Sequence, residues 1–304
     1  MKIILAGGSG YLGQMLARYY QSIADDIVIL SRVKKEAVQN VRTVVWDARS
    51  LGDWINELTG ADVLINLTGK NVNCRYTDAN QKEILQSRLE STAVLGQALR
   101  QVDRPPSLWI QAASATIYRH AEDRGMTEES GEIGDDFSMN VCRQWEAACR
   151  EQSTPQTRKV VLRIAIVLGN GGGAFPRLKN LTLVGLGGRQ GNGRQRVSWI
   201  HEKDVFNIIE WIRKEKQAQG VYNCSAPSPV TNAQLMKILR HVYQRPWGLP
   251  TPSWLLSMGA WLIGTEPELI LKSRWVLPER LLREKFSFEY PDLTDAVVHL
   301  KTNA

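Results

Sequence analysis

The chain has 304 residues, of which 43% are hydrophobic and 23% are charged, the composition of a folded protein rather than a disordered one. Its net charge is +7, but no basic run exceeds two residues, so we expect no nucleic-acid partner. No apolar segment approaches the ~20 residues of a membrane helix, and no membrane partner is expected either.

Cysteine usage points to a reducing compartment. Cys74, Cys142, Cys149 and Cys224 form no C-x-x-C pair and have no histidine cluster nearby. This spacing predicts neither a metal site nor a disulfide framework. Together with the lack of an export signal at the N-terminus, the free thiols predict a cytoplasmic protein.

The first half of the chain alternates strand-like and helix-like segments. The predicted strands are Lys2–Ala6, Ile27–Leu30, Thr43–Trp46, Val63–Leu67, Leu108–Ala112 and Val160–Leu168. The predicted helices are Leu12–Ser22, Asn80–Arg100 and Phe137–Arg150. Strands that are almost continuously apolar and alternate with helices predict an α/β fold with a doubly wound parallel Rossmann sheet.

The second half loses this rhythm. A stretch rich in glycine and arginine is followed by a predicted helix, Asp204–Arg213, and a strand, Val221–Asn223. Helices interrupted by prolines then run to the end. We therefore predict a Rossmann domain made of residues 1–168 and 197–226, and a smaller, mostly helical substrate lobe made of residues 169–196 and 227–304. Four tryptophans are expected to pack in the core of this lobe: Trp247, Trp254, Trp261 and Trp275.

A glycine motif lies directly between the first strand and the first helix. Its residues are Gly7, Gly8, Ser9, Gly10, Tyr11, Leu12 and Gly13. Glycines at this spacing allow a tight turn and a close approach of the backbone to a pyrophosphate, which the helix N-terminus then attracts. The strand–turn–helix context makes the motif specific for a dinucleotide.

The end of the second strand indicates which dinucleotide is bound. An NAD-binding fold usually places a carboxylate there, whereas this chain has Ser31 and Arg32. A guanidinium can bind a 2′-phosphate with two hydrogen bonds, which predicts NADP(H). Asp47 is placed to accept a hydrogen bond from the adenine amino group, and Leu67-Thr68-Gly69 is expected to pass beneath the cofactor.

Taken together, these residues resemble the extended short-chain dehydrogenases/reductases. The closest resemblance is to the NAD-dependent epimerase/dehydratase-like branch with a C-terminal domain of unknown function. The stretches that carry it include GGSGYLG, NLTGKNV, QKEILQSRLEST, VCRQWEAA, SWIHEKDV and VLPERLL. The resemblance implies NADP(H) binding, with cofactor contacts from Leu67, Thr68, Glu83, Arg88 and Val167.

The usual catalytic residues of that superfamily are missing. Ser114 fits the serine position at the end of the fifth strand, and Tyr118, four residues later, is an acid/base candidate. Ser138 and Cys142 stand where the superfamily has the tyrosine and lysine of its acid/base dyad. Ser114 and Tyr118 are therefore the candidate catalytic residues. Two other acid/base candidates are Tyr76 and His201, although His201 also suits a structural role, and Cys142 suits an inert buried thiol better than a nucleophile.

Two functions remain open on the sequence. The arginines of the glycine-rich stretch could clamp a phosphate or a nucleotide sugar: Arg189, Arg194 and Arg196. This favours an NADP(H)-dependent oxidoreductase or epimerase acting on a phosphorylated small molecule. The missing dyad leaves a non-catalytic redox sensor or regulatory module as the alternative. By analogy with related folds, a homodimer is plausible.

Overall fold

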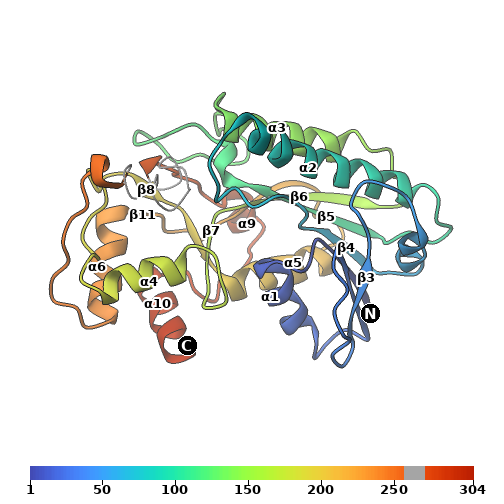
Figure 1. Cartoon of the computed structure of the whole chain (residues 1–304), viewed down its shortest axis with the longest axis horizontal. Helices are drawn as coiled ribbons and strands as arrows, with labels where there is room; N and C mark the ends of the chain where they lie inside the picture. Colours follow the sequence, from blue (N-terminus) through green and yellow to red (C-terminus); the bar gives the residue numbers. More distant parts are fainter. Residues whose placement is uncertain (257–270) are drawn as a thin grey trace.

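The computed structural model describes residues 1–256 and 271–304. At its centre is a sheet of seven strands that pair in parallel, in the order β10-β6-β5-β4-β1-β2-β3 (Figure 1). The strands are β1 (Lys2–Ala6), β2 (Asp26–Ser31), β3 (Val41–Val45), β4 (Val63–Asn66), β5 (Leu108–Ser114), β6 (Arg158–Ile164) and β10 (Gly220–Cys224). The predicted doubly wound parallel sheet is therefore confirmed.

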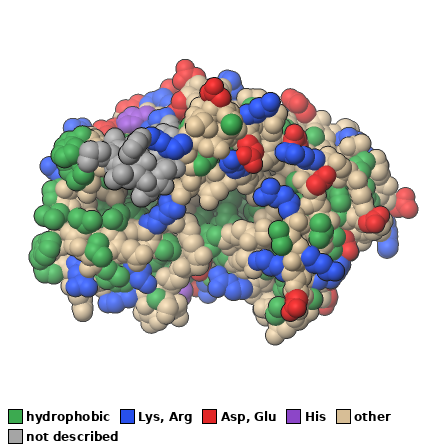
Figure 2. Space-filling model, in the orientation of Figure 1, with side chains coloured by type: hydrophobic (Ala, Val, Ile, Leu, Met, Phe, Trp, Pro, Cys, Tyr) green, Lys and Arg blue, Asp and Glu red, His purple; other side chains and the backbone are tan. Residues whose placement is uncertain are grey.

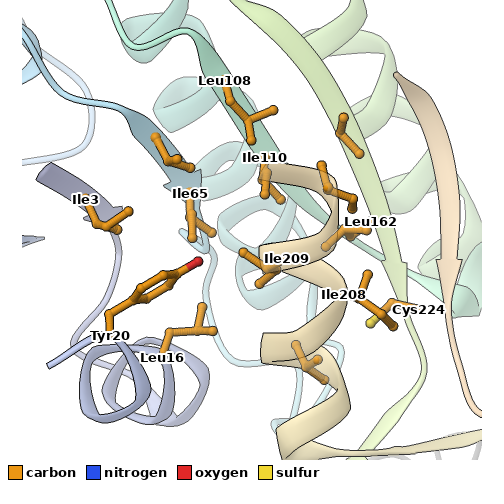
Figure 3. Close-up of a cluster of buried hydrophobic side chains, with 14 of the residues drawn as sticks. Ile3, Leu16, Tyr20, Ile65, Leu108, Ile110, Leu162, Ile208, Ile209 and Cys224 are labelled. Atoms are coloured by element: carbon orange, nitrogen blue, oxygen red, sulfur yellow. The ribbon is translucent and has the colours of Figure 1, made fainter. Parts of the chain in front are cut away.

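Helices cover both faces of this sheet. On one face lie α1 (Tyr11–Tyr20) and α5 (Glu202–Lys214), and on the other lie α2 (Asp78–Leu99) and α3 (Phe137–Arg150). Apolar residues fill both interfaces, which is why the strands are apolar on both sides. Figure 3 shows part of the first interface, where Leu16 and Tyr20 of α1 and Ile208 and Ile209 of α5 pack against the strands.

Local sequence explains where the long helices begin. The side chain of Thr77 accepts a hydrogen bond from the Asn80 amide at the start of α2, and Asp136 does the same for the Met139 amide at the start of α3. The first helix differs, because its N-cap is Gly10 and no side chain caps it. Two short 3-10 helices, η1 (Asp53–Leu58) and η2 (Ala115–Ile117), follow β3 and β5.

One predicted strand is wrong in its extent. Val160–Leu168 is divided at Ala165 into β6 and β7 (Ile166–Leu168). The Ala165 amide still donates to the Cys224 carbonyl of β10, but the Ile166 amide donates to Ser198, and β7 then pairs with β9 (Trp199–His201) outside the main sheet. The apolar run is continuous, so the change of partner leaves no mark on the sequence.

A second hydrophobic core lies beside the sheet, at the left of Figure 1. It is built from α4 (Phe175–Leu183), α6 (Asn232–Val242) and α10 (Leu293–Thr302), with a small sheet of β8 (Arg196–Val197) and β11 (Val230–Thr231) beside it. A short helix, α9 (Glu279–Arg283), returns to β10. We refer to the α4, α6 and α10 core as the lobe; the exact domain boundaries remain predictions.

The prediction that the tryptophans pack in the lobe core is wrong for two of them. Trp247 is 64% exposed and Trp254 is 66% exposed. Pro246, Pro250 and Pro252 keep the chain around Trp247 out of a helix, whereas Trp254 lies in a helical segment that begins at Ser253 and still faces outward. Trp275 is partly buried against the small core around Tyr118, and Trp261 lies outside the described residues.

Candidate cofactor and active site

A cleft of about 1360 Å³ opens at the carboxyl ends of the strands around β1, β2 and β4. Crevices at this edge of open α/β sheets are where ligands bind. Ten of the residues predicted to contact the cofactor line this cleft: Gly7, Ser9, Gly10, Ser31, Arg32, Asp47, Leu67, Thr68, Gly69 and Glu83. They come from five separate segments of the chain, so the fold brings together most of the predicted cofactor set.

The glycine motif is required by the backbone geometry. Gly7 has a φ of +70°, and a Cβ there would lie 2.7 Å from the Thr68 Cα. A Cβ on Gly13 would lie 2.3 Å from the Gly8 Cα, so only glycine lets α1 pack this close to the turn. A Cβ on Gly10, in contrast, would meet nothing within 4 Å, because this glycine faces the open cleft.

Two features of the cleft fit a dinucleotide phosphate group. The N-terminus of α1 has no side-chain cap, so its first amide groups remain available to an anion. Across the turn, Thr68 Oγ1 is buried and has no hydrogen-bond partner among the described residues. Such an unsatisfied hydroxyl is costly unless a bound group satisfies it.

The adenosine side of the cleft carries exposed cations. Arg32 lies at the end of β2 and has no carboxylate beside it in the chain, and the Ser31 hydroxyl accepts a hydrogen bond from the Val33 amide. Asp47 Oδ1 accepts from the amides of Arg49 and Ser50 at 2.8 Å each, and these two bonds hold the pKa of Asp47 below its usual range. Arg49 also lines the cleft, and the sequence reasoning missed it.

Five predicted contact residues do not line the cleft: Tyr11, Leu12, Gly13, Arg88 and Val167. Tyr11 turns away and donates a 2.6 Å hydrogen bond to Glu202 of α5. Arg88 lies directly beneath Gly69, donates to the carbonyls of Lys70 and Ile84, and stacks over the Trp145 ring at 4.9 Å. Its guanidinium therefore supports the cleft floor from behind.

Lys70 is a cleft residue that the sequence reasoning missed. Its ammonium pairs with Glu83 and donates to Asn80 Oδ1 at 2.9 Å. The pair with Lys70 lowers the pKa of Glu83. The predicted contact from Glu83 to the cofactor therefore involves a carboxylate that already has a partner, and the positive group at this end of the cleft is Lys70.

The structure removes Tyr118 from the list of accessible acid/base groups. Its hydroxyl is buried, contacts Asn223 Oδ1 at 2.9 Å and the Thr127 carbonyl at 3.0 Å, and accepts from Arg163 at 2.7 Å. Burial raises the pKa of Tyr118. Ser114, the last residue of β5, is partly exposed and donates a hydrogen bond to Thr116 Oγ1 at 2.9 Å.

Ser138 and Cys142, which the sequence analysis aligned with the usual dyad, lie in different surroundings. Burial raises the pKa of the Cys142 thiol to about 12, which fits an inert thiol and not a nucleophile. Ser138 Oγ lies 3.4 Å from the hydroxyl of Tyr76, which reaches it from the loop after β4. Behind them, Glu146 and Arg163 form a buried ion pair with contacts of 2.7 and 2.8 Å.

His201, another candidate, has a structural role. It is fully buried at the start of α5, where its Nδ1 accepts from the Lys203 amide at 3.1 Å. Its Nε2 lies 3.2 Å from Nδ1 of His299. Burial lowers the pKa of His201 to about 4, so the ring is neutral and caps the helix.

Basic groups from the end of the chain approach the start of α3. Lys272 pairs with the Asp136 carboxylate that caps α3, and Arg274 is close enough to help lower the pKa of Asp136 and to offset part of the rise that burial gives the pKa of Cys142. Neither residue was predicted, because both lie more than 120 residues from α3 in the sequence. The predicted arginine clamp is arranged differently, since Arg196 stacks on Trp275 at 4.3 Å and Arg194 lies near Glu122.

The fold and cleft together define a Rossmann-type nucleotide-binding protein. The chain belongs to the NAD-dependent epimerase/dehydratase family, which it matches over residues 3–225, and residues 251–300 match a domain of unknown function, DUF1731. It is 32% identical to the epimerase family protein YfhF of Bacillus subtilis, over 99% of this chain and 98% of that protein.

Two solved structures share the whole fold. The human epimerase family protein SDR39U1, crystallised with NADPH, superposes with a TM-score of 0.89 at 29% identity and covers all of both chains. A nucleoside-diphosphate sugar epimerase from Corynebacterium glutamicum gives a TM-score of 0.78 at 30% identity, over 98% of this chain and 57% of that one.

Within residues 1–256 and 271–304, no group of three or more His, Cys, Asp or Glu side chains is arranged to hold a metal ion. In the same ranges, no helix is both long enough and apolar enough to cross a membrane.

Proposed function

We propose that the chain is an NADPH-dependent oxidoreductase or epimerase of the cytoplasm that acts on a nucleotide sugar or a similar phosphorylated compound. The observation that carries the cofactor preference is the pair Ser31 and Arg32 on the cleft wall, with no carboxylate at the end of β2. A carboxylate there would repel a 2′-phosphate, whereas Arg32 attracts it. The NADPH-bound relative supports the same choice.

In this proposal, the cofactor cleft and the residues near the start of α3 have separate roles. The free amides of α1 bind the pyrophosphate, and Arg32 binds the 2′-phosphate. When bound, the nicotinamide supplies or accepts a hydride. Tyr76, whose hydroxyl lies 3.4 Å from Ser138 Oγ, holds the exchangeable proton on its phenol oxygen. Lys272 and Arg274, near the start of α3, attract the anionic part of the substrate.

A specific observation favours a second function, a non-catalytic NADPH-binding sensor. Ser138 carries an aliphatic alcohol, and Cys142 has a thiol whose pKa of about 12 keeps it protonated. Neither side chain can replace a tyrosine–lysine dyad. If Tyr76 also fails to support proton transfer, cofactor binding is left without turnover.

Calorimetric titration with NADPH and NADH tests the cofactor proposal. The wild type should prefer NADPH, and Arg32→Glu should weaken NADPH binding by roughly 10- to 100-fold through loss of charge-assisted hydrogen bonds, with little effect on NADH. Lys34→Glu, with the same charge change two residues away, is the matched control. Equal affinity of the wild type for both nucleotides would overturn the proposal.

Turnover is tested next, by following oxidation of NADPH in the presence of nucleotide sugars and simple carbonyl compounds. An active enzyme should lose most of its kcat in Tyr76→Phe and keep its NADPH affinity. A folded protein that binds NADPH and turns over none of the panel would favour the sensor instead.

A further inference from the structure

The end of the lobe farthest from the main sheet carries a surface that the cofactor cleft does not use. We call it the tip surface and define it as residues 184–191 and 245–255. Backbone hydrogen bonds hold the two stretches side by side: the Leu249 amide donates to the Gly185 carbonyl at 2.9 Å, and the Thr251 amide donates to the Arg189 carbonyl at 2.9 Å. The surface is therefore a built feature of the fold.

Large apolar side chains are exposed on the tip surface. Trp247 and Trp254 are each about two-thirds exposed, and Trp247 packs over Gly185. Of the thirteen large apolar side chains that are exposed among the described residues, six lie here: Val184, Leu186, Trp247, Leu249, Trp254 and Leu255. Single exposed apolar residues are common on protein surfaces, whereas a cluster of this kind marks an interaction site.

The same region is positively charged throughout. Residues 169–196 and 227–256 contain eight lysines and arginines and no aspartate or glutamate. Arg189, Lys237 and Arg245 are exposed, and no carboxylate of the described residues pairs with them. At the left end of Figure 2, apolar and basic side chains lie together.

These observations decide between kinds of partner. A second copy of this chain, docked by twofold symmetry, would bring two positive surfaces together with no carboxylate from residues 169–196 or 227–256 to compensate. A nucleic acid would use the cations but would gain nothing from exposed valine and leucine side chains. A bilayer containing anionic lipids uses both, since basic residues attract the headgroups while tryptophan and leucine enter the interface.

We infer that the tip surface docks the protein on an anionic lipid bilayer, with its Trp247 and Leu249 entering the interfacial layer. Its Arg189 and Arg245, together with Lys237 of α6, contact headgroup phosphates. This is peripheral attachment and requires no membrane-spanning helix. It departs from the sequence-based expectation of no membrane partner, which considered only spanning segments. It does not depend on the proposed function of the cofactor cleft.

Co-sedimentation of the full chain with vesicles tests this inference. Vesicles of phosphatidylcholine alone are compared with vesicles that contain phosphatidylserine as well. The protein should sediment with the second kind only, and less at high salt, because the attraction to headgroups is screened. Binding to neither kind, or equal binding to both, overturns the inference.

Two sets of variants localise the binding. Arg189→Gln/Lys237→Gln/Arg245→Gln should lower the partition coefficient by roughly 100-fold, at about fivefold for each basic residue removed. The matched control removes three exposed charges elsewhere: Arg150→Gln/Lys214→Gln/Lys216→Gln. It should bind almost as well as the wild type. If the two triple variants lose binding equally, general charge attraction explains the result and the inference fails.

The apolar contribution is tested with Trp247→Ser/Leu249→Ser against Ile23→Ser/Leu282→Ser, both of which replace exposed apolar side chains. Only the first pair should reduce vesicle binding, by about tenfold or more. NADPH affinity, measured on every variant, confirms that each is folded. If the tip variants bind vesicles normally, the surface serves another partner, such as an acidic protein, and the inference is overturned.

Discussion

The cofactor cleft and the start of α3 differ in what their residues can supply. At the cleft, Gly7, Gly10 and Gly13 adopt the geometry that a dinucleotide needs. At the start of α3, Ser138 and Cys142 supply an alcohol and a protonated thiol, and a buried Glu146–Arg163 ion pair lies behind them. The comparison shows that the backbone shapes the cleft, whereas any proton transfer at α3 depends on which side chains stand there.

The largest expected effect is at the glycine motif. Gly13→Ala places a Cβ 2.3 Å from the Gly8 Cα and 2.4 Å from its carbonyl oxygen, so α1 must move away from the turn. We expect the variant to unfold at much lower temperature or not to fold at all. Gly10→Ala is the control. Its backbone φ of −80° suits any residue and its Cβ meets no atom, so stability without cofactor should be unchanged while NADPH binding weakens.

Thermal unfolding with and without NADPH separates these two outcomes. A Gly13→Ala protein with wild-type stability would contradict the view that the backbone alone dictates this end of the sheet.

The next largest effect is at the ion pair behind α3. Glu146→Leu leaves Arg163 buried without its carboxylate, which should cost about 3–5 kcal/mol of unfolding free energy. Glu146→Leu/Arg163→Leu removes both charges and should recover most of that loss. Urea denaturation measures both. If the single variant is as stable as the double variant, the Glu146–Arg163 ion pair does not stabilise the region behind α3.

A lysine introduced at position 142, as Cys142→Lys, should be destabilising. Its ammonium would lie close to the Arg88 guanidinium, whose charge offsets part of the rise that burial gives the pKa of Cys142. Burial and like-charge repulsion together should cost about 2 kcal/mol or more relative to Cys142→Met, which has a similar length and no charge. If urea denaturation gives the lysine and methionine variants the same unfolding free energy, the site tolerates a lysine and the prediction is wrong.

The smallest effect concerns thiol reactivity. Because burial raises the pKa of Cys142 to about 12, its alkylation in the native protein should stay negligible from pH 7 to pH 9. Cys74, which is partly exposed, should react readily. Mass spectrometry after labelling in buffer and in urea distinguishes them. Rapid native labelling of Cys142 would show an accessible, activated thiol.

The elements that local patterns specify were predicted well. Phe137–Arg150 is a helix with the predicted bounds, and β1 runs over Lys2–Ala6 as predicted. Apolar periodicity and capping residues act within a few positions, so a single segment contains the information. The break at Ala165 was not predictable, since it follows from a change of strand partner and not from the residues themselves.

The site was predicted unevenly for the same reason. The glycine motif, Ser31 and Arg32 could be placed because each has a fixed position relative to a strand of the sheet. Lys70 and Arg49 line the cleft without any such motif, and Lys272 reaches Asp136 from the other end of the chain. The burial of Tyr118, 105 residues from its partner Asn223, was equally hidden.

The sequence by itself determined the parallel Rossmann sheet and the place of the glycine turn between β1 and α1, because these depend on short segments with a fixed relation to strands. Only the tertiary structure decided which candidates remain accessible. It buried Tyr118 and His201, brought Tyr76 to Ser138, and left Trp247 exposed on a basic surface. Each of these outcomes results from packing between segments that are distant in the chain, where the sequence pattern of one segment carries no record of the other.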